Sequence, residues 1–386
     1  MKRLTPRYAT SAIALGFIFV VQPVQADVTV QTGTPVSTAA QYLPAYYGFI
    51  HAHTAYSIDY KGAKDETPDF AFAFARDVAG LDWMAVSDHS ESFVGQTGDA
   101  HWEATARAAA DSTEDGRFVA FRAFEYSNSF QGHLCVLDTE SFTNWQTDPM
   151  LHQFYSWLDD HPEAVATFNH PGSPIELMQQ EFYHFRYEPK AAPTIVGMEV
   201  ISSGSRFEQR DRGYDGEVSF FDEAVLQGWW LAPVSGEDSH RANWGTTTDN
   251  RTGVLAEALT KDDLLAAFRA RRVFASEDRN AYLSLDHGEH AMGSAVVVSG
   301  AQQLDVYFSD PDSGERWTAM SVYQNGVIVS EEPLSFAGAG TARIDVPAPV
   351  STDYYYVRVE QQDGERVQSA PIWLTRSATA TVAADF

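Results

Sequence analysis

Short apolar runs alternate with longer amphipathic segments from about Leu43 to Ser276. This alternation is typical of βα units, in which a buried strand is followed by a helix that covers the sheet. One helix is clear in "DETPDFAFAFARDVAG", where we expect Thr67 as the N-cap, Pro68 as the first helical residue and Gly80 just past the end. The run "LDWMAV" that follows predicts the next strand.

The last helix of this part is predicted in "TKDDLLAAFRARRVFA". Thr260 is its expected cap, and Asp262 and Asp263 lie in the first turn, where acidic side chains favour the positive end of the helix dipole. Beyond this helix, apolar residues recur with period two, and "QNG" and "QDG" mark turns. We therefore expect an α/β unit over residues 27–281 and an antiparallel β-sandwich over residues 282–386.

The first 26 residues show the pattern of an export signal. Lys2, Arg3 and Arg7 precede a short apolar run, and small side chains at Val24 and Ala26 indicate cleavage after residue 26. A membrane anchor is the alternative, but the apolar run is about half of the ~20 residues that a spanning helix needs. We expect a soluble periplasmic or secreted protein, because no later segment is long and apolar enough to span a membrane.

The charge of the chain excludes some classes of binding partner. There are 26 lysines and arginines against 53 aspartates and glutamates, and loss of the three basic signal residues leaves 23 against 53, a net charge of −30. Such a surface repels polyanions, so neither nucleic acid nor an anionic membrane is an expected partner. A small-molecule substrate is expected instead, and the oligomeric state stays open. Cys135 is the single cysteine, which excludes an intramolecular disulfide.

Residue types that bind metals recur where the apolar runs end. They are His51, His53, Asp88, His89, Glu125, His170, Asp238 and His240, together with His133 at the start of the run "LCVL". In a barrel of parallel strands the C-terminal strand ends meet on one face, so such residues share a pocket. In "FIHAHTAYSID" both imidazoles can face the same way. Imidazoles and carboxylates suit Zn, Mn and Fe, and the single cysteine excludes a thiolate-built zinc site.

Six motifs follow one another in an order and spacing known from one family: "HAHTAYSID", "VSDHSE", "FRAFEYS" with "GHLCVLD", "FNHPG", "GMEVIS" and "SGEDSH". They span Gly48 to about Arg241, and through them the sequence resembles the polymerase and histidinol phosphatase (PHP) family of metallohydrolases. The downstream segment and the β-rich tail look like an exported branch related to carbaryl hydrolases. The resemblance implies a distorted (β/α)7 barrel with two or three divalent metal ions.

Carried over residue by residue, the resemblance implies a set of metal ligands. They are His51, His53, Asp59, His89, Glu125, His133, His170, Asp238 and His240. Glu125 would bridge two metals, and Asp59 stands one residue later than the aspartate of many family members. Asp88 would orient His89 or a metal-bound water. Glu199 occupies a strand end of the family, where a structural and a catalytic role both stay open.

The implied chemistry is hydrolysis by a metal-bound hydroxide, because coordination lowers the pKa of water to roughly 7. An exported phosphoesterase acting on small organophosphates is the leading expectation, with Arg206 and Arg241 holding the phosphate. A metal-bound water, Asp59 or Asp88 would supply the proton to the leaving group. Hydrolysis of carbamates, amides or esters, as the carbaryl-hydrolase branch implies, is the alternative. A non-catalytic metal-binding or interaction protein is the third hypothesis.

Overall fold

The chain is described here from a computed structural model that covers residues 26–32, 42–172, 181–202, 211–214 and 216–377. Within these ranges it forms 20 strands and 5 α-helices, so it is mostly β-structure. The expected export signal up to residue 25, and Arg206, lie outside the described residues. Over the described ranges, no helix combines the length and the hydrophobicity of a membrane span.

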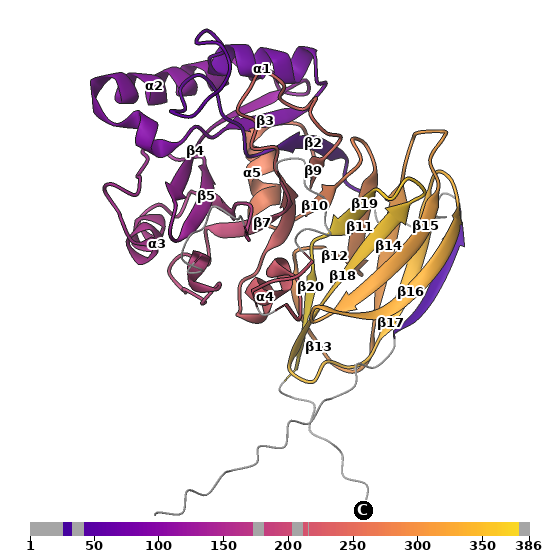
Figure 1. Cartoon of the computed structure of the whole chain (residues 1–386). Helices are drawn as coiled ribbons and strands as arrows, with labels where there is room; N and C mark the ends of the chain where they lie inside the picture. The colour runs from indigo at the N-terminus through magenta and orange to yellow at the C-terminus, as the bar shows by residue number, and fades with distance from the viewer. Residues whose placement is uncertain (1–25, 33–41, 173–180, 203–210, 215, 378–386) are drawn as a thin grey trace, which may run out of the picture.

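The first part of the chain forms a mixed sheet with helices packed around it (Figure 1). Its strands are β2 (Ala45–Phe49), β3 (Trp83–Val86), β4 (Val119–Asn128), β5 (Gly132–Leu137), β6 (Val165–Phe168), β7 (Ile195–Ile201), β8 (Ala232–Ser235), β9 (Arg251–Leu255) and β10 (Val273–Ser276). Its helices are α1 (Pro68–Asp77), α2 (Gly95–Ser112), α3 (Leu151–Asp159), α4 (Phe220–Leu226) and α5 (Lys261–Arg269), with 3₁₀ turns η1 (Ser90–Phe93) and η2 (Glu181–Tyr183).

Two parallel groups of strands carry this sheet. Strands β2, β3 and β4 pair in parallel, as do β6, β7 and β8. Between the groups, β5 is antiparallel to both β4 and β6. On the other side, β2 is antiparallel to β9, and β9 to β10. In the described residues this hydrogen-bonded path ends at β8, and no ladder joins β8 to β9 or β10.

The β4–β5 hairpin departs from the expected alternation of strands and helices. The side chain of Asn128 accepts a hydrogen bond from the backbone N–H of Phe130 at 3.0 Å, and Gly132 has φ of 100°. A Cβ atom at Gly132 would lie 2.3 Å from the ring of Phe182, so only glycine fits this turn. The hairpin pairs Ser127 with His133 and brings the latter beside the end of β4.

The two predicted helices form, but their caps differ. Helix α5 begins as expected, since the Thr260 hydroxyl accepts a hydrogen bond from the backbone N–H of Asp263 at 3.2 Å. Thr67 stands at the N-cap of α1, but its side chain makes no capping hydrogen bond. Its hydroxyl donates to the Asp69 carboxylate at 2.5 Å instead, so Thr67 takes the predicted N-cap position without the capping hydrogen bond.

The C-terminal strands form two layers around a shared apolar core. One sheet has the order β1-β17-β14-β11-β12, and the other layer is built on β16, β15, β18, β19, β20 and β13. The strands are β11 (Tyr282–His287), β12 (His290–Ala291), β13 (Ala295–Val298), β14 (Gln302–Ser309), β15 (Trp317–Gln324), β16 (Val327–Phe336), β17 (Gly340–Val346), β18 (Thr352–Gln361), β19 (Arg366–Ser369) and β20 (Ile372–Arg376). Period-two side chains from both layers, such as Val306 and Val322, are buried between them.

Two strands join the parts of the chain. Strand β1 (Asp27–Thr32) pairs with β17 over its whole length, so this segment lies in the C-terminal sheet and not with the rest of residues 27–281, with which it was predicted (Figure 1). Strand β10 pairs with β19, which makes the sheet of the first part continuous with a C-terminal layer. The predicted division near residue 281 is therefore not a break in the hydrogen bonding.

Candidate metal centre

The candidate ligands that follow the ends of two strands lie close together. His51 and His53 follow β2, and Asp238 and His240 follow β8. Two backbone hydrogen bonds join these segments, from the N–H of His53 to the carbonyl of Ser239 at 3.0 Å and from the N–H of Asp238 to the carbonyl of His51 at 3.1 Å. This join aligns the imidazoles from one strand end with the carboxylate from the other.

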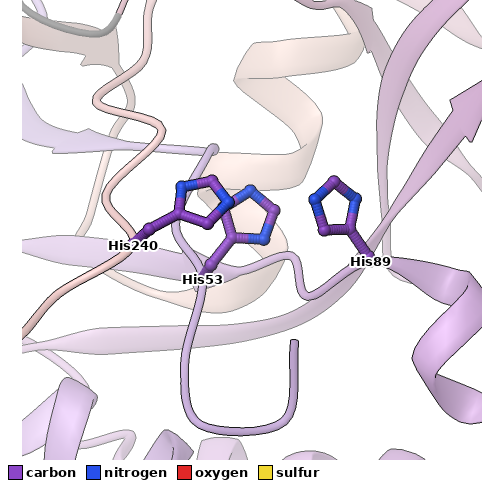
Figure 2. A group of neighbouring side chains, drawn as sticks. All are labelled: His53, His89 and His240. Carbon is purple, nitrogen blue, oxygen red and sulfur yellow. The ribbon is translucent and has the colours of Figure 1, made fainter. Parts of the chain in front are cut away.

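Three overlapping groups of side chains could each hold a metal ion. The ligand atoms within each group lie within 4.8 Å of one another. The groups are His53, His89 and His240; His51, His53 and Asp238; and His51, Glu125 and His170. Figure 2 shows the imidazoles of the first group reaching one another from three separate segments of the chain. The rings of His53 and His240 stack with their centroids 4.1 Å apart.

Glu125 lies at the centre of the cluster. Its carboxylate oxygens are 3.1 Å from His51 Nε2, 2.9 Å from His89 Nδ1, 3.3 Å from His133 Nδ1 and 3.6 Å from His170 Nε2. Glu125 is buried, but these imidazoles outweigh the burial and hold its pKa well below its usual range. Glu125 lies within β4, which runs on to Asn128, and not after a strand that ends at Phe124 as predicted.

Asp59 closes the cluster on its exposed side. Its Oδ2 atom is 2.9 Å from His240 Nε2 and 3.3 Å from His89 Nε2, and its side chain is 47% exposed where that of Glu125 is 1% exposed. Hydrogen bonds from these two histidines lower the pKa of Asp59 against the effect of burial. In turn, burial disfavours protonation of His89, but Glu125 and Asp59 raise its pKa to about 11. Asp59 thus belongs to the cluster despite its shifted position in the motif.

Groups behind the histidines fix their ring orientations. Nδ1 of His51 donates to the Glu199 carboxylate at 2.9 Å, and the second oxygen of that carboxylate accepts the backbone N–H of His170 at 2.8 Å. Nδ1 of His53 is 2.9 Å from the Ser57 hydroxyl, and Nδ1 of His89 contacts the Ser127 hydroxyl. Such partners leave the Nε2 atoms of His51 and His53 turned toward the cluster.

The donor set fits divalent metals. His51 Nε2, His53 Nε2 and Asp238 Oδ1 are mutually 3.1 to 3.2 Å apart, so three electron-pair donors point at a common centre. Imidazole nitrogen and carboxylate oxygen are ligand types that Zn, Mn and Fe accept. Cys135 does not add a thiolate, because burial raises the pKa of its thiol to about 12. The set is therefore nitrogen and oxygen only.

Asp88, one of the predicted catalytic groups, makes other contacts than those expected. The carboxylate of Asp88 is buried and accepts hydrogen bonds from the backbone N–H of Thr54 at 2.6 Å and from its hydroxyl at 2.7 Å. It thus holds the segment after His53 in place. Of the two expected roles, orienting His89 or a metal-bound water, the first belongs to other residues, since the His89 ring contacts Asp59, Glu125 and Ser127. Arg241 directly follows His240 and is exposed. Arg206 lies outside the described residues.

Several residues that lie at the centre were not among the predicted site residues. Ser57 and Ser127 stand inside the quoted motifs "HTAYSID" and "FRAFEYS", and Asn169 precedes His170 in "FNHPG". The Asn169 amide donates to Glu125 at 2.8 Å. Glu91, in "VSDHSE", has two buried carboxylate oxygens without a hydrogen-bond partner in the part of the chain that the structure describes, and burial raises its pKa to about 7. The sequence feature that could have indicated these residues is their position close to the predicted metal ligands within the motifs.

Comparisons with known proteins add little to this geometry. No protein-family model matches the chain, and no curated protein matches it. Fibronectin(III)-like modules of CbhA from Clostridium thermocellum align with 25% of this chain and 99% of theirs, at 15% identity and a TM-score of 0.19. An engineered protein aligns over 82% of both chains at 12% identity and a TM-score of 0.23. An endo-beta-1,4-mannanase from Thermotoga petrophila aligns with 81% of this chain and 72% of its own, at 9% identity and a TM-score of 0.21. Scores this low establish neither a shared fold nor a shared activity.

Proposed function

We propose that this chain is a metal-dependent hydrolase of the PHP type, with strands β2 to β10 arranged as a distorted (β/α)7 barrel. The observation that supports this most directly is the position of Glu125, whose two oxygens lie near four imidazoles while Asp238 and Asp59 flank the same cluster. A carboxylate shared in this way suits two or three divalent ions, and the nitrogen and oxygen donors suit Mn, Zn or Fe.

Different side chains would have different roles in such a centre. Divalent ions bound there supply Lewis-acid activation of water and of a substrate oxygen. Glu199 and Ser57 hold the rings of His51 and His53 so that Nε2 faces inward. Asp59 is ionised and is the more exposed carboxylate, so the substrate would approach from its side, where Asp59 would accept a hydrogen bond from the attacking water and orient it.

A phosphoester of a small organic molecule is the leading substrate in this proposal. Clustered divalent ions suit phosphoryl transfer, and Arg241 beside His240 offers a guanidinium to the phosphate oxygens. A neutral carbamate, amide or ester is the second candidate. The strongly acidic chain favours it, because an anionic substrate approaches against a field that a neutral one does not meet.

One assay separates these candidates. The metal-loaded protein is tested for kcat/KM on a phosphomonoester, a phosphodiester, an aryl ester and an aryl carbamate, with fixed metal and salt. A phosphoester turned over fastest supports the leading proposal, and a carbamate or ester turned over orders of magnitude faster replaces it with the second. Protein that binds metal but turns over none of the four supports the non-catalytic hypothesis.

Export is also part of the proposal, since the first 26 residues carry a basic, an apolar and a small-residue region. Mass spectrometry of protein recovered from the periplasm or medium should give Asp27 as the first residue. A cytoplasmic pool that retains Met1, with none in the exported fraction, would argue against export.

A further inference from the structure

His170 enters the metal centre from a strained position of the backbone. Its φ is 28°, a positive value that residues other than glycine seldom adopt, and such a conformation persists only where surrounding contacts hold it. One of these contacts is the hydrogen bond at 2.8 Å from the backbone N–H of His170 to Glu199. The chain then continues through Pro171 and Gly172, so the contacts of Gly172 are the next that hold this segment.

Gly172 is held by a carboxylate and by an aromatic ring. Its backbone N–H donates to Glu181 Oε2 at 2.7 Å, and Glu181 is 1% exposed. The same oxygen accepts a hydrogen bond from the Tyr214 hydroxyl. A Cβ atom at Gly172, which has φ of 76°, would lie 2.4 Å from the ring of Phe220. Only glycine fits against this ring, so a shift of either Glu181 or Phe220 displaces the segment after His170.

The ring of Phe220 is tied to strand β18 of the C-terminal layers. Phe220 is the first residue of α4, and Asp222 lies in the same turn and is 1% exposed. The Asp222 carboxylate accepts hydrogen bonds from the hydroxyls of Tyr354 at 2.9 Å and of Tyr356 at 3.1 Å. Both tyrosines belong to β18, so this strand fixes the start of α4 (Figure 1).

The segment that carries Tyr214 is tied to the same strand. Arg358 donates two hydrogen bonds to the Asp211 carboxylate, at 3.0 and 3.2 Å, which is the bidentate geometry of a strong charge-assisted contact. Asp211 lies three residues before Tyr214. Alternate side chains of a strand lie on one face, so Tyr354, Tyr356 and Arg358 form a single row that holds both supports of Gly172.

We propose that strand β18 positions His170 in the metal centre, through α4 and through Glu181. The inference rests on the metal centre of the proposed function and gives the C-terminal layers a role in it. Glu181 and the β18 side chains act through His170 as positioning residues. Their loss would weaken the ion held by His51, Glu125 and His170 and would spare an ion held by the three histidines of Figure 2, which come from other segments.

Cobalt(II) titration of the metal-free mature chain, followed by visible absorption, measures the affinity of each equivalent of metal. Glu181→Ala should weaken one equivalent about tenfold or more, as loss of a group behind a metal ligand commonly does. Glu181→Gln should recover part of this loss, because its amide oxygen can still accept from the Gly172 N–H and from the Tyr214 hydroxyl. His170→Ala identifies the equivalent, since it removes the ligand itself.

The β18 contacts are tested with a matched control on the same strand. The double variant Tyr354→Phe/Tyr356→Phe removes both hydroxyls from Asp222 and should weaken the same equivalent of cobalt by a smaller factor than Glu181→Ala. Tyr355→Phe removes a buried hydroxyl that has no hydrogen-bond partner among the described residues. This control should bind cobalt as the wild type does.

The His170→Ala background separates positioning from a general loss of stability. In that background neither Glu181→Ala nor Tyr354→Phe/Tyr356→Phe should weaken cobalt binding further, because their effect passes through the missing ring. Melting curves establish which variants are folded, and if Glu181→Ala is not, the tyrosine variant decides. An equal loss in both backgrounds, or wild-type affinity in the folded variants, would overturn the positioning role and leave the metal centre intact. Wild-type protein that takes up no cobalt would overturn both.

Discussion

The Nε2 atoms of His51 and His53 lie 3.1 Å apart, and both side chains are fully buried. A ring nitrogen that bears a proton could donate to the other, but Asp238 Oδ1 is also close to both, at 3.2 Å from His51 Nε2 and 3.1 Å from His53 Nε2. Three donors at this spacing surround a point rather than forming a simple pair. Burial, together with the nearby imidazole of His89, lowers the pKa of His53 to about 3, so this ring keeps its lone pair available at neutral pH.

The first prediction concerns the metals themselves. Purified protein should contain at least two equivalents of Mn, Zn or Fe, measured by elemental analysis, and chelation should abolish hydrolysis. The double variant His51→Ala/His53→Ala should lose most of this metal and keep the circular dichroism spectrum of the folded chain, because both histidines lie beyond the end of β2.

His287→Ala/His290→Ala is the matched control, since these rings also lie near each other, with centroids 6.2 Å apart, but are remote from Glu125 along the chain. It should retain full metal content. Wild-type protein that is fully active without metal would rule out the proposed centre.

The second prediction tests Glu199 as a positioning residue. Its carboxylate holds both the His51 ring and the His170 backbone. Glu199→Ala should weaken metal affinity about 10- to 100-fold, as removal of such partners commonly does, and Glu199→Gln should recover part of the loss because its amide oxygen can still accept. Metal affinity is measured by competition with a chromophoric chelator. Glu163→Gln, at an exposed position, serves as the control; equal affinity in all variants would contradict the role.

The third prediction separates the candidate substrates by charge. Arg241→Ala or Arg206→Ala should lower kcat/KM for a phosphoester by about tenfold to a thousandfold, which corresponds to about 1.4 to 4 kcal/mol of transition-state stabilisation. A guanidinium gives a phosphate a bidentate contact that a neutral carbamate cannot use, so carbamate turnover should be unchanged. If both substrates respond equally to both substitutions, the arginines do not recognise phosphate.

The fourth prediction concerns stability and pH at Asp286. Burial and the neighbouring Asp305 raise the pKa of Asp286 to about 6, above its value in the unfolded chain. The folded state therefore holds the proton more tightly, and its contribution to stability is lost as pH rises from about 4 through about 6. Asp286→Asn should raise the free energy of unfolding at pH 8 by about 1 to 3 kcal/mol and change it little at pH 4.

Urea unfolding at the two pH values measures this difference. Asp345→Asn, at an exposed carboxylate of the same sheet, should leave the free energy of unfolding nearly unchanged at both. A variant at Asp286 that is destabilised equally at pH 4 and pH 8 would mean that the carboxylate is needed for its hydrogen bonds and not penalised for its charge.

The parts of the centre that follow a strand end were accessible from sequence. His51 and His53 come after a short apolar run, and two residues of alternation put both rings on one side. His133 could not be placed in this way, because it lies early in β5 and reaches Glu125 only through an antiparallel hairpin. That hairpin depends on a turn at Gly132 and on the ring of Phe182 from a distant segment, which no local pattern predicts.

The pairing of strands that are far apart in the sequence could not be predicted either. The alternation of apolar residues in the C-terminal part predicts strands but not which strands become neighbours, since register depends on contacts between segments far apart. The pairing of β10 with β19 is of this kind. Likewise, Asp88 was assigned beside His89 from adjacency in the chain, whereas Thr54 satisfies its carboxylate in space.

The pairing of β1 with β17 sets an order for folding. Asp27 is opposite Asp345, a separation of 318 residues, so this edge of the sheet cannot form until nearly the whole chain has been synthesised. Contacts of such high sequence separation form slowly, because the entropy of closing the loop opposes them. Until then β17 presents an unpaired edge that can add a strand from another molecule. Deletion of residues 27–32 should therefore promote self-association through β17, although it removes nothing from the metal centre.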